Sequence, residues 1–87
     1  MKLIYYTQND FKEHRVTVKS KYEIAKHILI AWNYEKCVYD ENLQIIFDPY
    51  ESMVINNEIL NEYGLGIKEH DGFYRVYNLK SGYMYKY

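Results

Sequence analysis

Apolar residues recur with a helical period between residues 21 and 34. Ser20 precedes this segment and Glu23 follows three residues later, which is the spacing of a capping box. Ile30 falls on the polar side of the helical wheel, and we expect it either to pack under a neighbouring loop or to form an exposed apolar contact. The segment therefore predicts an amphipathic helix. Its apolar side consists of Ile24, Ala25, Ile28, Leu29, Ala31 and Trp32.

A second helical period runs from residue 48 to residue 64. Asp48 is a suitable N-cap, Pro49 fits the first helical position, and Gly64 provides a left-handed end. The apolar side consists of Met53, Ile55, Ile59, Leu60 and Tyr63. The opposite side carries three carboxylates, which we call the acidic stripe: Glu51, Glu58 and Glu62. The pattern predicts a helix with an acidic outer face, although an ordinary solvated helix face would look the same.

Alternation and β-prone composition predict strands in the first half of the chain. Residues 2–7 form a short β-prone run, and residues 15–19 alternate strictly between apolar and polar positions. Together they predict a hairpin with its loop around residues 9–14. Residues 37–47 are ambiguous, because they fit either a short hairpin or a single strand over residues 43–47.

The last third of the chain has the pattern of a three-strand meander. Residues 65–70 and residues 73–79 flank the dipeptide Asp71-Gly72, which is typical of a two-residue hairpin turn. Residues 83–87 follow a second turn and alternate tyrosines with other residues, which predicts the final strand.

The order of these elements predicts an α+β fold, with residues 1–87 forming a single domain. We expect a small two-layer arrangement, with the N-terminal hairpin and the C-terminal meander in one antiparallel sheet and both helices on one face of it. The reason is that a two-stranded hairpin is only marginally stable alone. The expected core is Leu3, Val16, Val18, Ile24, Ile28, Leu29, Trp32, Ile45, Ile55, Ile59, Leu60, Ile67, Val76 and Leu79.

Tyrosine is unusually frequent, with 12 residues against three Phe and one Trp. Because a tyrosine packs like an apolar residue but needs a partner for its hydroxyl, many of these rings should be half-exposed. Cys37 is the only cysteine, so we expect a reducing compartment, and no apolar run reaches transmembrane length. The composition favours a cytoplasmic protein without membrane contact.

Side chains capable of catalysis or metal binding are scattered along the chain. His14, His27 and His70 lack the spacing that puts two ligands on one helix face, so we expect solvated surface histidines. Cys37 has no histidine at motif spacing and is expected to be a buried structural thiol. No glycine-rich run is available to cradle a phosphate. We therefore expect neither enzymatic activity nor a bound metal or cofactor.

The net charge of −1 conceals an uneven distribution of charge. Residues 1–27 carry six Lys/Arg and three Asp/Glu, residues 28–64 carry one and seven, and residues 65–87 carry four and two. An acidic middle of −6 therefore lies between basic ends of +3 and +2. Scatter in a small protein would produce a similar distribution.

The tyrosine excess and the segregated charge favour a protein-interaction module. Its expected contact residues are Glu51, Glu58, Glu62, Tyr83 and Tyr85, because carboxylates complement a basic partner and exposed tyrosines contribute interface energy. In size and charge pattern only, the chain is comparable to small inhibitors encoded by mobile elements, such as anti-CRISPR proteins. A protein of a nucleic-acid-handling complex is therefore one candidate partner.

Direct nucleic-acid binding is the alternative hypothesis. Its expected residues are Arg75, Lys80, Lys86 and Tyr74, which combine cations with aromatic rings on the last strands. The isoelectric point of about 6.3 argues against this alternative. A tyrosine ladder packed across strands would also explain the aromatic residues without any nucleic acid.

Overall fold

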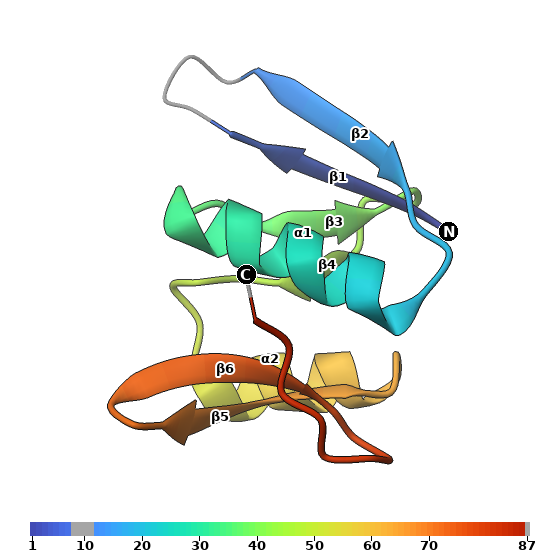
Figure 1. Cartoon of the computed structure of the whole chain (residues 1–87). Coiled ribbons are helices and arrows are strands. Elements are labelled where there is room, and N and C mark those ends of the chain that lie inside the picture. The colour runs from blue at the N-terminus through green and yellow to red at the C-terminus, as the bar shows by residue number, and fades with distance from the viewer. Residues whose placement is uncertain (8–11, 87) are drawn as a thin grey trace.

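The computed structural model describes residues 1–7 and 12–86, and it confirms the α+β class (Figure 1). Within these residues no helix is long and apolar enough to cross a membrane. The elements in chain order are β1 (Lys2–Tyr6), β2 (Glu13–Thr17), α1 (Lys21–Asn33), β3 (Val38–Asp40), β4 (Ile45–Phe47), α2 (Met53–Asn61), β5 (Leu65–His70) and β6 (Phe73–Asn78).

The strands form two antiparallel sheets, one with the order β2-β1-β3-β4 and one that pairs β5 with β6. The expectation of a single sheet shared by the two ends of the chain is therefore wrong. The reason lies in the ambiguous segment, which folds as the hairpin β3–β4 and pairs with the free edge of β1, with Ile4 opposite Tyr39. Once β3 occupies that edge, the N-terminal hairpin has the further strands it needs for stability.

The C-terminal meander is only partly formed. Asp71 and Gly72 have φ values of 53° and 80°, as the expected two-residue turn requires, and they join β5 to β6. The expected last strand is reduced to one bridge between Tyr77 and Met84, flanked by the hydrogen bond from Tyr85 N–H to the Val76 carbonyl at 2.9 Å. Its final residue lies outside the described residues, as do residues 9–11 of the loop expected around residues 9–14. Residues 13 and 14 of that expected loop already belong to β2.

Helix α1 agrees closely with its sequence pattern. The Glu23 N–H donates to Ser20 Oγ at 3.2 Å, which confirms Ser20 as the N-cap. Ile24, Ala25, Ile28 and Ala31 are buried, and Ile30 is half-buried against the core. Ile30 is therefore mainly a packing residue.

Helix α2 begins later than its sequence pattern predicts. Its N-cap is Ser52, whose Oγ accepts the Ile55 N–H at 3.2 Å, and the expected cap at Asp48 is wrong. Asp48 instead forms a turn, in which its Oδ1 accepts the Tyr50 N–H at 2.9 Å. Consequently Glu51 precedes the helix and the C-cap is Glu62, so the acidic stripe is not one face of a helix.

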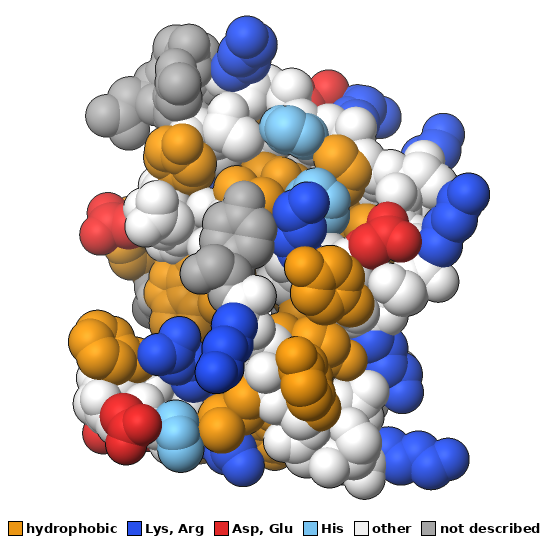
Figure 2. All heavy atoms as spheres, in the orientation of Figure 1, with side chains coloured by type: hydrophobic (Ala, Val, Ile, Leu, Met, Phe, Trp, Pro, Cys, Tyr) orange, Lys and Arg blue, Asp and Glu red, His pale blue; other side chains and the backbone are white. Residues whose placement is uncertain are grey.

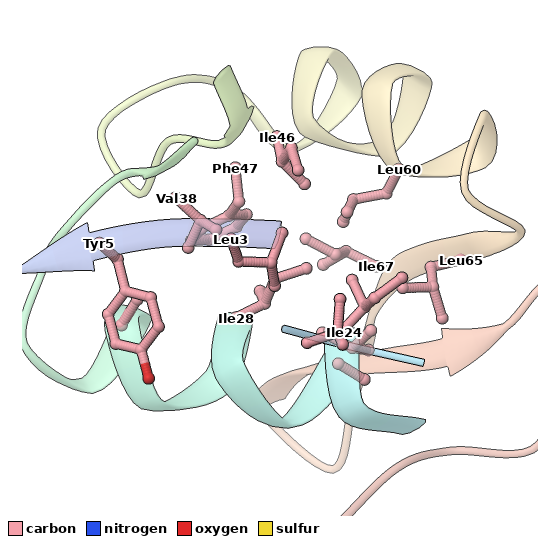
Figure 3. Close-up of a cluster of buried hydrophobic side chains, with 14 of the residues drawn as sticks. Leu3, Tyr5, Ile24, Ile28, Val38, Ile46, Phe47, Leu60, Leu65 and Ile67 are labelled. Atoms are coloured by element: carbon pink, nitrogen blue, oxygen red, sulfur yellow. The ribbon is translucent and has the colours of Figure 1, made fainter. Parts of the chain in front are cut away.

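One cluster of buried side chains joins the two sheets, because α1 packs against β1 and β6 while α2 packs against β4 and β5. Figure 3 shows Leu3 of β1 close to Ile28 of α1, Tyr5 further along the same strand, and Leu60 and Ile67 on the side of the C-terminal half. The helices therefore connect two sheets and do not lie together on one face of a single sheet.

The core differs from the expected set in several members. Ile45, Ile55 and Leu79 are exposed, so their assignment to the core is wrong. In β4 the pairing with β3 is irregular, and both Ile46 and Phe47 are buried while Ile45 faces solvent. The other buried hydrophobic residues outside the expected set are Ile4, Tyr5, Ala25, Ala31, Val38, Leu65 and Tyr85.

Candidate interaction surface

An open groove of about 460 Å³ lies between the C-terminal half of α1, the loop before α2 and the start of β6. Four of its lining side chains are aromatic: Trp32, Tyr50, Phe73 and Tyr74. We call it the aromatic groove. Tyr50 and Phe73 are 74% and 66% exposed, which is unusual for rings of this size. The groove therefore presents apolar area that folding leaves in water.

Trp32 links the floor of the groove to the core. Its ring lies 5.0 Å from that of Phe47, which is fully buried, and 5.9 Å from that of Tyr74, which is half-exposed. These centroid distances are typical of favourable aromatic pairs. The floor is therefore held by the core itself.

Tyr50 is positioned by a loop that a buried asparagine holds in place. Asn56 is fully buried; its Oδ1 accepts the Asp48 N–H at 2.8 Å and its Nδ2 donates to the Asp48 carbonyl at 2.7 Å. The Tyr50 hydroxyl donates to Glu35 Oε2 at 3.2 Å across the groove. Partial desolvation, followed by this hydrogen bond and the charge of Glu35, raises the pKa of Tyr50. The ring thus presents a protonated hydroxyl at neutral pH.

Glu35 occupies a backbone position that usually suits glycine. It follows α1 with a φ of 56°, and the next residue, Lys36, donates its N–H to the Ala31 carbonyl at 2.9 Å. Such left-handed ends cost a residue with a Cβ about 1 kcal/mol or more. The chain nevertheless carries a glutamate there, and its carboxylate lies at the groove.

A second hollow of about 370 Å³ extends this surface along α1. It shares Leu29 and Asn33 with the aromatic groove and adds Ile30, Tyr34 and Arg75. The C-terminal half of α1 is therefore flanked by two open hollows, which contain both apolar and polar side chains.

The structure separates the residues expected to bind a protein partner. Glu51, Glu58 and Glu62 are all exposed, but only Glu58 lies within α2. Tyr83 is exposed, whereas Tyr85 is buried and accepts a hydrogen bond from Asn78 Nδ2 at 3.1 Å. The two ring centroids lie 5.3 Å apart, so Tyr85 packs against the exposed Tyr83 ring and is not itself an exposed contact.

The residues expected to bind nucleic acid also divide between two faces. Alternation along β6 places Tyr74 on the side of the buried Val76, where it meets Trp32, and places Arg75 on the other side. Lys80 lies in the turn after β6, and Lys86 lies beyond the bridge of the C-terminal segment. The expected set is therefore not a single patch.

A cluster of three ionisable rings was not apparent from the sequence. The buried Tyr5 has its hydroxyl 2.8 Å from His27 Nδ1, and the His14 ring stacks on Tyr5 with a centroid distance of 5.0 Å. Burial chiefly, then the charges of Lys26 and His14, lower the pKa of His27. The expectation of a solvated His27 is wrong, because the three rings meet only through the register of β1 with β2 and the packing of α1.

Other ionisable side chains of the described residues meet at two further places, at the β5–β6 turn and around Cys37, where Asp48 and Tyr39 lie close by. His70 is exposed, with its Nε2 3.2 Å from Asp71 Oδ2, and the half-buried Cys37 has a pKa raised by burial and by Asp48. In the part of the chain that the structure describes, no group of three or more His, Cys, Asp or Glu residues is placed to hold a metal ion. Comparison with family models, with curated proteins and with solved structures identifies no match for this chain.

Proposed function

We propose that this chain is a non-enzymatic protein-interaction module that holds its partner in the aromatic groove. One observation carries the proposal: four aromatic side chains from three separate segments line an open groove, and two of them are largely exposed. Aromatic side chains provide much of the binding energy of protein interfaces, at a low cost in conformational entropy. A preformed groove also reduces the cost of ordering side chains on binding.

The charge around the groove favours a partner with a basic contact region. Glu35 lies at the groove and Glu51 directly follows Tyr50. Glu58 in α2 and Glu62 at the end of α2 are two further exposed carboxylates of the same molecule. Carboxylates near an apolar groove accelerate encounter with a cationic surface and help to select it. We therefore infer a partner with an apolar anchor next to Lys or Arg, as proteins that handle nucleic acid in the cytoplasm often present.

Affinity capture from a lysate of the native cells tests the groove. Tyr50→Ala should reduce the recovered partner about tenfold or more, because truncation of an interface hot spot costs at least about 2 kcal/mol. Tyr22→Ala is the matched control, since it removes another exposed ring outside the groove. Equal recovery by Tyr50→Ala and by the unmodified chain, both shown to be folded, would contradict the proposal.

The role of the acidic residues is tested separately by reversing Glu51, Glu58 and Glu62 together to Lys. The triple variant should capture the partner more slowly, and its capture should depend less on salt, because the reversal removes long-range attraction. Surface plasmon resonance with the identified partner measures both quantities. Unchanged association rates at low salt would remove these three residues from the proposal and leave the groove.

A further inference from the structure

The outward face of the β5–β6 hairpin differs from the rest of the surface. The inward positions Leu65, Ile67 and Val76 are buried in the core, so the register places the alternate residues on the opposite side. These outward positions are Gly66, Lys68, His70, Phe73, Arg75 and Tyr77. The face therefore alternates cations with aromatic rings.

Three cations form a row across this face. Lys68 is directly opposite Arg75 in the pairing of β5 with β6. On the other side of β6, Tyr77 faces Met84, and the Tyr85 N–H donates to the Val76 carbonyl at 2.9 Å. The same antiparallel register, continued by one residue, would place Lys86 beside Arg75. We call Lys68, Arg75 and Lys86 the basic row. In Figure 2, Lys and Arg side chains gather beside hydrophobic ones over β6 and the C-terminal segment.

The aromatic rings of this face lie against the cations. Lys68 Nζ is 4.7 Å from the centre of the Tyr77 ring, and Arg75 Cζ is 5.6 Å from the centre of the Phe73 ring. Gly66 makes room for one of them, since a Cβ at Gly66 would lie 2.5 Å from Tyr77 Cζ. Cations and rings are thus held side by side on a short sheet.

Carboxylates are absent from the outward positions of this hairpin and from Met84 and Lys86 beside it. The two carboxylates of the hairpin are Glu69, which alternation places on the opposite side of β5, and Asp71, which lies at the turn and contacts His70. This face is consequently basic even though the whole chain carries a net charge of −1. A polyanion approaching here meets three cations at the spacing of neighbouring strands, about 5 Å.

We infer that this face binds single-stranded nucleic acid, with phosphates on the basic row and a base stacked on Phe73. Phe73 is two-thirds exposed at the edge of the row, and a base in a single strand offers its ring face to such a side chain. A duplex keeps its bases stacked inside, so it reaches only the cations. A protein rich in carboxylates could contact the three cations, but it has no bases to stack on the exposed Phe73 ring.

Fluorescence anisotropy with a fluorescein-labelled oligothymidylate and with the matching oligouridylate tests this inference. Binding should be detectable at about 50 mM salt and should weaken with a slope of about −2 in log K against log salt, as three phosphate contacts to a single strand imply. Arg75→Ala should make that slope shallower by about 0.7. Lys19→Ala, which removes an exposed cation outside this face, is the matched control and should leave the slope unchanged.

The ring provides the second readout. Phe73→Ala should weaken binding of the single strand at least about fivefold. The unmodified chain should also bind a hairpin duplex at least about fivefold more weakly than it binds the single strand. Far-UV circular dichroism checks that each variant is folded. If Arg75→Ala does not fold, Lys68→Gln takes its place in the salt measurement. Absence of binding at low salt, equal effects of Lys19→Ala and Arg75→Ala, or equally tight binding of duplex or polyglutamate would each overturn the inference.

The proposed nucleic-acid face adjoins the aromatic groove, because Phe73 belongs to both and Arg75 also lines the second hollow. A residue that belongs to the groove alone therefore separates the two proposals. Tyr50 lies in the groove and outside the outward positions of the hairpin, so Tyr50→Ala should leave oligonucleotide binding within twofold of the unmodified chain. A fivefold loss in that variant would show that the oligonucleotide occupies the groove, and it would overturn the assignment to the basic row.

Discussion

Within the described residues, Glu35, Leu43 and Asp71 are the only residues other than glycine with positive φ. Asp71 tolerates this geometry well, because its short side chain bonds locally. Leu43 has no such compensation: its φ is 62° and its side chain is 68% exposed. It ends the β3–β4 turn, where Asp40 Oδ1 accepts N–H groups from both Asn42 and Gln44. At the residue scale, Glu35 and Leu43 therefore hold backbone strain at positions where a glycine would adopt the same φ without it.

Leu43→Gly should raise the free energy of unfolding by about 1 kcal/mol, because it removes the left-handed penalty and little buried contact. Urea denaturation followed by circular dichroism measures the change. Gln44→Gly is the control, since Gln44 has no positive φ; it should lower stability by about 0.5–1 kcal/mol. A destabilised Leu43→Gly variant would show that Leu43 makes contacts that outweigh the strain.

The lowered pKa of His27 predicts a pH dependence of stability. The folded chain binds a proton at His27 less readily than the unfolded chain does. The contribution of neutral His27 to the free energy of unfolding is therefore complete above an ordinary histidine pKa of about 6.5 and is lost as the pH falls below that value. His27→Gln should therefore flatten the dependence of unfolding free energy on pH between about 7 and 5. Gln44→Ala, which changes an exposed side chain that carries no charge, should leave this pH dependence as in the unmodified chain. Identical pH profiles for His27→Gln and the unmodified chain would contradict this assignment.

At the scale of elements, α2 shows how a buried polar side chain decides where a helix starts. The local pattern supports a start at Asp48, but the Asp48 N–H and carbonyl are both bonded to Asn56, which lies one turn inside the helix. Ser52 then becomes the N-cap of α2. Residues 49–51, between Asp48 and this cap, stay outside the helix, and Tyr50 lines the groove. One tertiary arrangement thus shortens α2 and creates the loop that the proposed site needs.

Asn56→Ala should lower the free energy of unfolding by about 1–3 kcal/mol, because it leaves backbone groups of the loop without their partner. The same variant should capture the protein partner less well, since Tyr50 loses its fixed position. Val54→Ala removes an exposed side chain of the same helix and is the control for stability. A loss below about 0.3 kcal/mol would mean that water replaces these bonds at little cost.

For the whole molecule, the helices are the link between two small sheets. A two-stranded sheet such as β5–β6 has little stability alone, so it depends on α1 and α2 to share the core of the four-stranded sheet. The aromatic groove lies where α1 meets β6, and the basic row lies on the outward side of the same hairpin. Both proposed surfaces therefore depend on the docking of the C-terminal hairpin.

Ile28→Ala tests whether the two sheets unfold together. Ile28 is fully buried in α1 within the shared core, so the substitution should cost about 2–5 kcal/mol. Urea transitions followed by Trp32 fluorescence and by far-UV circular dichroism should move together and remain coincident. Separate transitions by the two probes would show that the C-terminal hairpin unfolds independently.

The sequence by itself determined the α+β class, helix α1 with its Ser20 cap, the β1–β2 pairing and the Asp71-Gly72 turn. These features depend on single segments or on segments that are consecutive in the chain, so capping, alternation and turn chemistry suffice to predict them. Only the tertiary structure decided which strand occupies the free edge of β1, where α2 begins, and which tyrosines remain exposed. Those outcomes depend on competition between distant segments for the same edges and the same buried volume. A local pattern cannot express that competition, because several pairings satisfy it equally well.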